Sequence, residues 1–147
     1  MNQYYEVRAV STALQTYLAT KGWTDLTPKE GWDNKTPIAL RDVSVYIVKS
    51  SKVQLELGSK SKTFKRPIQV DAYMETEAQA GAIADDIMDF MDDMPLNIVS
   101  ESNTILGTMV CDTDTIMSDT MPPNYSNPKV TWWRGVVRGT YESNYLS

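Results

Sequence analysis

The spacing of apolar residues changes abruptly at Thr76, and this change constrains the fold more than any other feature. Before it, apolar residues alternate with polar ones at the two-residue period of a strand, at Ile68, Val70, Ala72 and Met74. After it, they recur at the 3.6-residue period of a helix, at Ala80, Ile83, Ala84, Ile87, Phe90, Met91 and Met94. Thr76 and Gln79 fit a capping box, and Pro95 would end the helix. The pattern predicts a strand that turns directly into a helix.

An earlier helix is indicated between Gln3 and Lys21, with Gly22 as its C-cap. Its apolar stripe is Val7, Val10, Leu14, Tyr17 and Leu18. Strands are expected at 43–48, 53–57, 68–74, 96–99, 104–111 and 129–141, with loops at 23–40 and 117–128. Pro67 is expected at a bulge or an edge, because proline cannot donate to a strand ladder.

The order of these elements predicts one domain, 1–147, of the α+β class. We expect a mostly antiparallel β-sheet with a long β-hairpin around the turn 58–62, covered by two α-helices.

Several classes of chemistry lack their usual residues. The chain has no histidine and no glycine-rich phosphate loop, and its single cysteine, Cys111, is expected to be a half-buried strand residue. Asp112 and Asp114 begin like a calcium loop, but Ile116 takes the next ligand position. A net charge of -5 disfavours general nucleic-acid binding, and no segment is apolar enough to span a membrane. We therefore expect a protein that is not an enzyme and needs no cofactor or metal.

Charges are sorted along the chain. Residues 49–66 hold six Lys and Arg against one acid, whereas residues 67–128 hold twelve acids and no Lys or Arg. Acids crowd one face of the predicted second helix, where like charges repel and an isolated monomer gains nothing. We hypothesise that the basic hairpin of one subunit engages the acidic helix of the next subunit or of another protein. The candidate interface residues are Lys52, Lys60, Lys62, Lys65, Arg66, Asp85, Asp86, Asp89, Asp92 and Asp93.

The junction from Arg66 to Ile87 resembles that of tail terminator (tail-completion) proteins of long-tailed bacteriophages. The first helix, the hairpin and the late strand are similar in layout. The resemblance implies a virion protein, assembled in the host cytoplasm, that forms a ring, usually of six, at the head-proximal end of the tail tube. Such a ring halts tube polymerisation and joins the tail to the head connector, while DNA passes through its lumen without specific binding. The acids would line that lumen or the subunit interface.

Three alternatives stay open. One is another neck or head-completion connector protein, which would also form a ring. A small carboxylate- or metal-dependent enzyme would need a concave pocket that gathers several acids. A cellular adaptor domain would be monomeric. Trp132 and Trp133 are adjacent on a predicted strand, so at most one is core and the other is an interface candidate.

Overall fold

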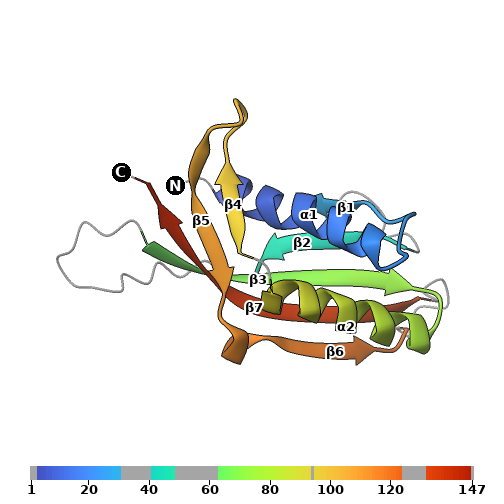
Figure 1. Cartoon of the computed structure of the whole chain (residues 1–147). Coiled ribbons are helices and arrows are strands. Elements are labelled where there is room, and N and C mark those ends of the chain that lie inside the picture. Colours follow the sequence, from blue (N-terminus) through green and yellow to red (C-terminus); the bar gives the residue numbers. More distant parts are fainter. Residues whose placement is uncertain (1–2, 31–40, 49–62, 94, 124–131, 147) are drawn as a thin grey trace.

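A computed structural model describes residues 3–30, 41–48, 63–93, 95–123 and 132–146, with only the backbone of Asp93. Two α-helices lie on one face of a curved seven-stranded sheet (Figure 1). The α+β class and the mostly antiparallel sheet are therefore confirmed. Neither described helix combines the length and the hydropathy needed to cross a lipid bilayer.

The elements follow the predicted order, with some additions. They are α1 (Gln3–Thr20), β1 (Pro28–Glu30), β2 (Val43–Ile47), β3 (Thr63–Met74), α2 (Glu77–Asp93), β4 (Leu96–Val99), β5 (Ile105–Cys111), a short 3-10 helix η1 (Thr113–Thr115), β6 (Met117–Met121) and β7 (Trp133–Tyr145).

The sheet is organised around β3 and β7, which pair along the whole twelve-residue length of β3. The strand order is β1-β2-β3-β7-β5-β4, and β6 also pairs with β7. β6 and β5 occupy successive stretches of the β7 edge that β3 leaves free. Every pair is antiparallel except β1 with β2.

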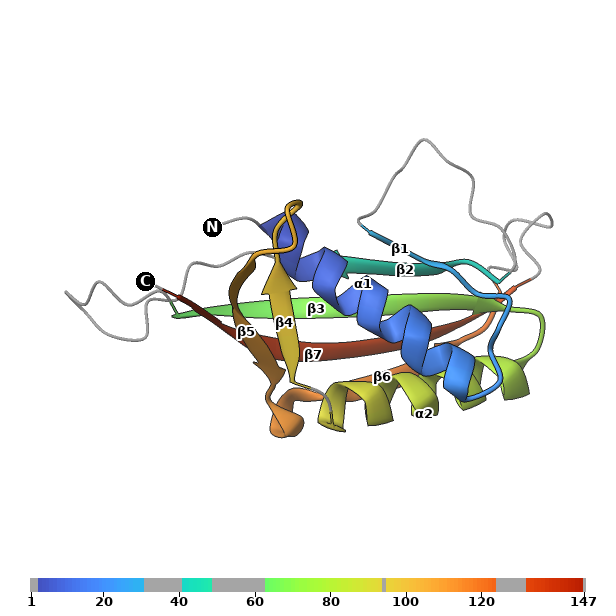
Figure 2. The ribbon, with the colours of Figure 1, turned by 45° about the horizontal axis from the view of Figure 1, so that its top comes forward.

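The core lies between this sheet and the two helices (Figure 2). The apolar stripes of α1 and α2 meet the strands there in one cluster. The backbones approach closely at Gly135 of β7, where an added Cβ would lie 2.6 Å from the carbonyl oxygen of Ala80. Alternate residues of β3 are fully buried, as strand alternation requires for the face that meets the helices; they are Ile68, Val70, Ala72 and Met74.

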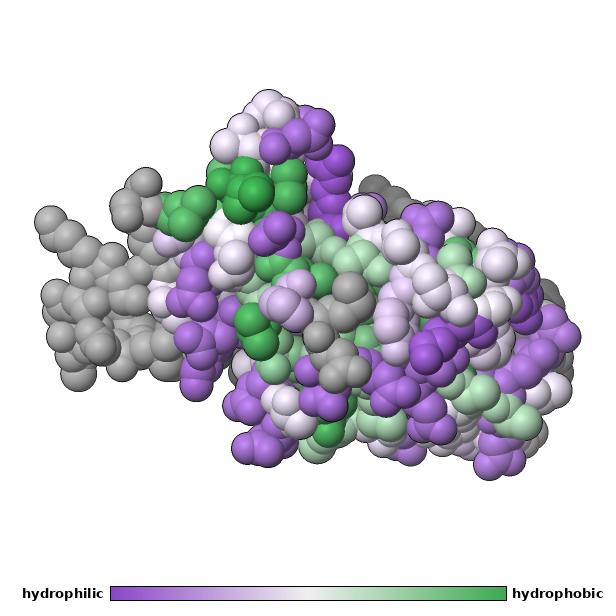
Figure 3. Space-filling model, in the orientation of Figure 1, coloured by the Kyte–Doolittle hydropathy of each residue, from purple (hydrophilic) through white to green (hydrophobic). Residues whose placement is uncertain are grey.

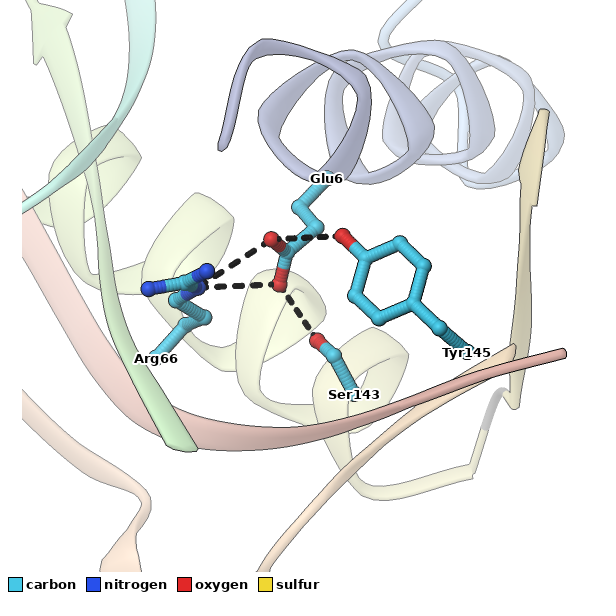
Figure 4. A network of polar contacts seen from close by, with 4 residues as sticks. All are labelled: Glu6, Arg66, Ser143 and Tyr145. Carbon is cyan, nitrogen blue, oxygen red and sulfur yellow. Dashed lines mark hydrogen bonds and ion pairs between the residues drawn. The ribbon is translucent and has the colours of Figure 1, made fainter. Parts of the chain in front are cut away.

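A buried ion pair fastens α1 to the two central strands (Figure 4). Both carboxylate oxygens of Glu6 accept hydrogen bonds from Arg66 Nε, at 3.2 and 3.1 Å. Ser143 Oγ also donates to this carboxylate, and Tyr145 Oη donates to it at 2.8 Å. Glu6 is fully buried and Arg66 is 3% exposed. A buried charge is tolerated only when it is paired and hydrogen-bonded, so these contacts determine where the first turn of α1 lies.

The N-terminal capping box predicted for α2 is confirmed in part, and the C-cap glycine predicted for α1 is confirmed. The backbone N–H of Gln79 donates to Thr76 Oγ1 at 3.1 Å, which caps α2. The reciprocal half of the capping box is wrong, because Gln79 Oε1 is buried without a hydrogen-bond partner among the described residues. Gly22 has φ +95° just after α1, as a C-cap glycine should.

Two predicted loops contain strands, which corrects the sequence prediction. β1 lies within 23–40, and β6 lies within 117–128. Both are short edge strands without clear alternation, and pairing with β2 or β7 specifies them rather than their own pattern. β7 also starts at Trp133 and continues to Tyr145, whereas the sequence predicts 129–141.

Of the two positions predicted for Pro67, the bulge is wrong, because this residue lies within β3 opposite Thr140 without a register shift, whereas it does lie past the last residue pair between β2 and β3. Its carbonyl accepts from the backbone N–H of Val48, just past the end of β2. The backbone N–H that proline lacks would point to the same side of β3 as this carbonyl. β2 has already ended at this position, so proline is tolerated there. The predicted strand 53–57 and turn 58–62 lie outside the described residues, whereas the antiparallel pairing of β2 with β3 is observed.

Replacing Glu6 by alanine should lower the free energy of unfolding by about 3 to 5 kcal/mol, because the charge of Arg66 would stay buried without a partner. Urea denaturation measures this change. The matched double variant Glu6→Leu with Arg66→Met removes both charges and should recover most of the loss. A cost below about 1 kcal/mol for Glu6→Ala would contradict the role given to the pair.

Tyr141 should tolerate loss of its hydroxyl. The residue is fully buried, and its hydroxyl oxygen has no hydrogen-bond partner among the described residues. We expect Tyr141→Phe to raise the free energy of unfolding by about 1 kcal/mol, because an unsatisfied polar group leaves the core. A loss of similar size in the same urea measurement would show that the hydroxyl is bonded.

Candidate assembly interface

We use the name open face for the side of the sheet that is turned away from both helices. Side chains alternate between the two faces along each strand. The residues whose sequence neighbours lie in the core therefore point to the open face. One cross-strand row runs through Tyr46, Gln69, Arg138 and Met117. On β2, β3, β7 and β6 the open face includes Tyr46, Gln69, Asp71, Tyr73, Arg134, Val136, Arg138, Met117, Asp119 and Met121, and toward the start of β3 it continues with Lys65 opposite Glu142.

A chain of hydrogen bonds holds the middle of the open face. Tyr46 Oη donates to Asp71 Oδ2 at 2.6 Å, and Gln69 Nε2 donates to Asp71 Oδ1 at 2.8 Å. Arg138 donates to Gln69 Oε1 through Nε at 3.2 Å and Nη2 at 2.7 Å. Asp71 and Gln69 are buried, whereas Arg138 is exposed. The network therefore presents the guanidinium of Arg138 to the surroundings in an ordered position.

The tyrosines of this face are held in their neutral form. Burial and the hydrogen bond to Asp71 raise the pKa of Tyr46 well above its usual range. Burial, followed by the charge of Asp71, also raises the pKa of Tyr73. At neutral pH the hydroxyl of Tyr46 therefore remains a donor to Asp71.

Several residues of the open face are of types that are enriched in protein interfaces, beside the charged residues Asp71, Asp119 and Lys65. Aromatic residues, methionine and arginine are enriched in such surfaces, and lysine is depleted. Met117 is 63% and Met121 37% exposed. Trp132 contacts Tyr73 edge to face, with 6.2 Å between ring centroids, whereas Trp133 packs against the core. This division of the two tryptophans agrees with the prediction that at most one is core.

The outward side of α2 is a second candidate surface, on the opposite side of the domain. Ala78, Ala82, Asp85 and Asp89 are exposed there. Gly81 lies among them, and a Cβ added to it would meet nothing within 4 Å. No ion pair within the described part of the chain involves Asp85 or Asp89. This surface is low in relief and acidic.

Two other acids predicted for the interface serve contacts within the subunit. Asp86 is half-buried and accepts a hydrogen bond from Trp23 Nε1 at 2.8 Å. Asp92 is exposed and accepts from Thr113 Oγ1 at 2.8 Å, which joins α2 to η1. The side chain of Asp93 lies outside the described residues.

The predicted basic surface is corrected at Arg66. That side chain is buried against Glu6, with its guanidinium 4.8 Å from the centre of the Phe64 ring. Lys65 is exposed and lies on the opposite face of β3, in register with Glu142 of β7. Consecutive strand residues point to opposite faces, so these two cations cannot form one patch. The remaining predicted cations lie outside the described residues; they are Lys52, Lys60 and Lys62.

The enzyme alternative requires a concave site that gathers several acids. A cavity of about 690 Å³ beside the β2 edge is lined by Glu30 and Asp71, among others. Both carboxylates are already hydrogen-bonded, Glu30 by Ser11 and Asp71 by Tyr46 and Gln69. Within the described residues, no three His, Cys, Asp or Glu side chains are grouped to hold a metal ion.

Cys111 is buried rather than half-buried, and burial raises the pKa of its thiol to about 11. Such a thiol stays protonated at neutral pH, so it is a poor nucleophile.

Hydrophobic side chains also gather at the base of the projecting β4–β5 hairpin and near the end of β7 (Figure 3). Ile105 is 50% and Leu146 63% exposed in this region. This apolar patch had no sequence signal beyond ordinary strand alternation.

Replacing Tyr46 by phenylalanine should lower the free energy of unfolding by about 1 kcal/mol at pH 8, because Asp71 loses a donor. The native pKa of Tyr46 is raised above its unfolded value of about 10, so its stabilisation is complete below that pH and is lost as pH rises further. The difference between wild type and Tyr46→Phe should therefore shrink between about pH 8 and pH 11 in urea denaturation. A difference that grew over this range would contradict the assigned hydrogen bond.

No protein-family model matches the sequence, and no curated protein matches it. A solved structure whose name states no function is similar over 100% of this chain and 99% of its own, with a TM-score of 0.57 at 12% sequence identity. Likeness at this level of identity shows a shared fold, and function has to be inferred from the surfaces described above.

Proposed function

We propose that this protein is a structural subunit that assembles with copies of itself into a ring, in the manner of phage tail terminator proteins. In that role it would belong to the virion, at the head-proximal end of the tail tube. It would stop tube polymerisation and present a surface to the head connector, and DNA would pass through its lumen without specific binding.

One observation carries the proposal: two arginines on one side of this two-layer domain and two aspartates on the other have no ion-pair partner within the described residues, although the exposed Asp119 also lies on the side of the arginines. Arg134 and Arg138 lie on the open face, and Asp85 and Asp89 lie on α2. Two different surfaces on one subunit favour a head-to-tail contact between copies. Such contacts produce closed rings when the rotation between neighbours permits.

The composition of the open face supports the same proposal. Its exposed methionines, ordered arginine and aromatic side chains suit a contact that excludes water. A side chain whose position is already held by hydrogen bonds loses less conformational entropy when a partner binds. Neck or head-completion connectors would use such faces in the same way, and position in the particle separates them from a terminator.

The assembled state provides the test. We expect wild-type protein to give ring-shaped particles in negative-stain images and a mass that is a multiple of the 16.6 kDa chain in light scattering. Assembly should weaken between about 50 mM and 500 mM salt, because surface charge pairs are screened. A strict monomer at every concentration and salt level would overturn the proposal and favour the adaptor alternative.

A further inference from the structure

We infer that the open face of one copy packs against the outward side of α2 of the next copy, with Arg134 and Arg138 facing Asp85 and Asp89. This inference rests on the proposed function and specifies which surfaces make the ring contact. It replaces the basic hairpin with the two arginines of β7 as the partners of the acidic helix.

The arginines of β7 are suited to such a contact because no carboxylate of the described residues neutralises them. Arg41 pairs with Asp25 and Arg66 pairs with Glu6, whereas no described carboxylate lies within ion-pair distance of Arg134 or Arg138. Arg138 bonds instead to a neutral amide oxygen on β3. Its planar guanidinium is thus ordered and keeps donors for a carboxylate of another chain.

Two acids of the sheet lie in the row between these arginines, Asp71 on β3 and Asp119 on β6, and neither is within ion-pair distance of them. Asp119 lies on β6 opposite Val136, between the rows of Arg134 and Arg138. Its Oδ1 accepts from the backbone N–H of Thr120 at 2.8 Å. Within the described residues, both arginines therefore remain available to a carboxylate of another chain.

The outward side of α2 offers the matching chemistry and shape. Asp85 and Asp89 are one helical turn apart, so two carboxylates lie in line on one side of the helix. Small residues permit close packing of helix on sheet, as the close approach at Gly135 already shows inside the subunit. Small residues also precede the two acids and keep the surface low; they are Ala78, Gly81 and Ala82.

The contact uses each surface once per copy. α2 covers one face of the sheet and the open face is the other, so a subunit can engage one neighbour on each side (Figure 2). Every sheet would then lie between its own α2 and that of a neighbour. The contact is heterologous and can repeat around a ring.

Charge reversal tests this pairing. In one variant Arg138→Glu places acid against acid, and in the other Asp89→Arg places base against base. Each should raise the concentration for half-assembly at least about tenfold, because opposed like charges cost several kcal/mol at an interface. Thermal unfolding of each monomer checks that the variants are folded, and Asp89 is exposed enough to be replaced without disturbing the core.

Mixing the two variants in equal amounts gives the sharper result. In an alternating assembly the two substituted residues face each other at one junction with their charges exchanged, and the native pair meets at the next junction. Assembly should therefore return to within about threefold of wild type. The single chain carrying both Arg138→Glu and Asp89→Arg should assemble similarly. Matched controls are Lys21→Glu after the end of α1 and Glu101→Arg at the β4–β5 turn, which should change assembly by less than about twofold.

The outcomes separate the inference from the proposed function. If wild type assembles and neither reversal weakens assembly, or if mixing restores nothing, the pairing is wrong although the ring proposal stands. If wild type never assembles, both are overturned. Weakening by each reversal together with recovery on mixing supports the pairing.

Discussion

The buried pair of Glu6 and Arg66 is the contact on which the arrangement of the domain depends. It joins the first turn of α1 to β3 and, through Ser143 and Tyr145, to the end of β7. These partners are separated from Glu6 by 60 to 139 positions in the sequence. Because the ion pair lies on the helix side of the sheet, α1 is held on the same face as α2, and neither of the two described helices covers the other face.

Because both described helices lie on one face of the sheet, the other face is available for a contact. A sheet covered on one side must solvate its second face or bury it against a partner. Here the second face carries a polar network that ends in an ordered arginine, flanked by exposed methionines. The acidic side of α2 lies on the opposite side of the domain. The subunit thus has two different surfaces, one with two arginines and one with two aspartates that form no ion pair among the described residues, and we propose that these surfaces meet in a head-to-tail contact.

Much of the fold could be predicted because local spacing carried it. The change of period after β3 located α2, and alternation located β2 and the second half of β3. The strands β1 and β6 were not predicted, because pairing with β2 and β7 specifies them rather than a local sequence pattern. The candidate site was predicted less well. Adjacent cations at Lys65 and Arg66 suggested one basic patch, although a two-residue period places them on opposite faces. The polar residues Gln69 and Asp71 alternate with core residues in the sequence, but the bond from Gln69 to Arg138 crosses 69 positions of sequence. No local pattern reports such a contact.

We propose that this domain works as one unit of a ring in which every sheet lies between two helices, its own α2 and a neighbour's. Electron cryomicroscopy of the assembled wild-type protein tests this claim most directly, because it images both faces of each subunit in place. We expect density of an adjacent α2 against Arg138, with the carboxylates of Asp85 and Asp89 within ion-pair distance of the arginines of β7. An assembly in which the open face met solvent, or met a surface other than α2, would contradict it.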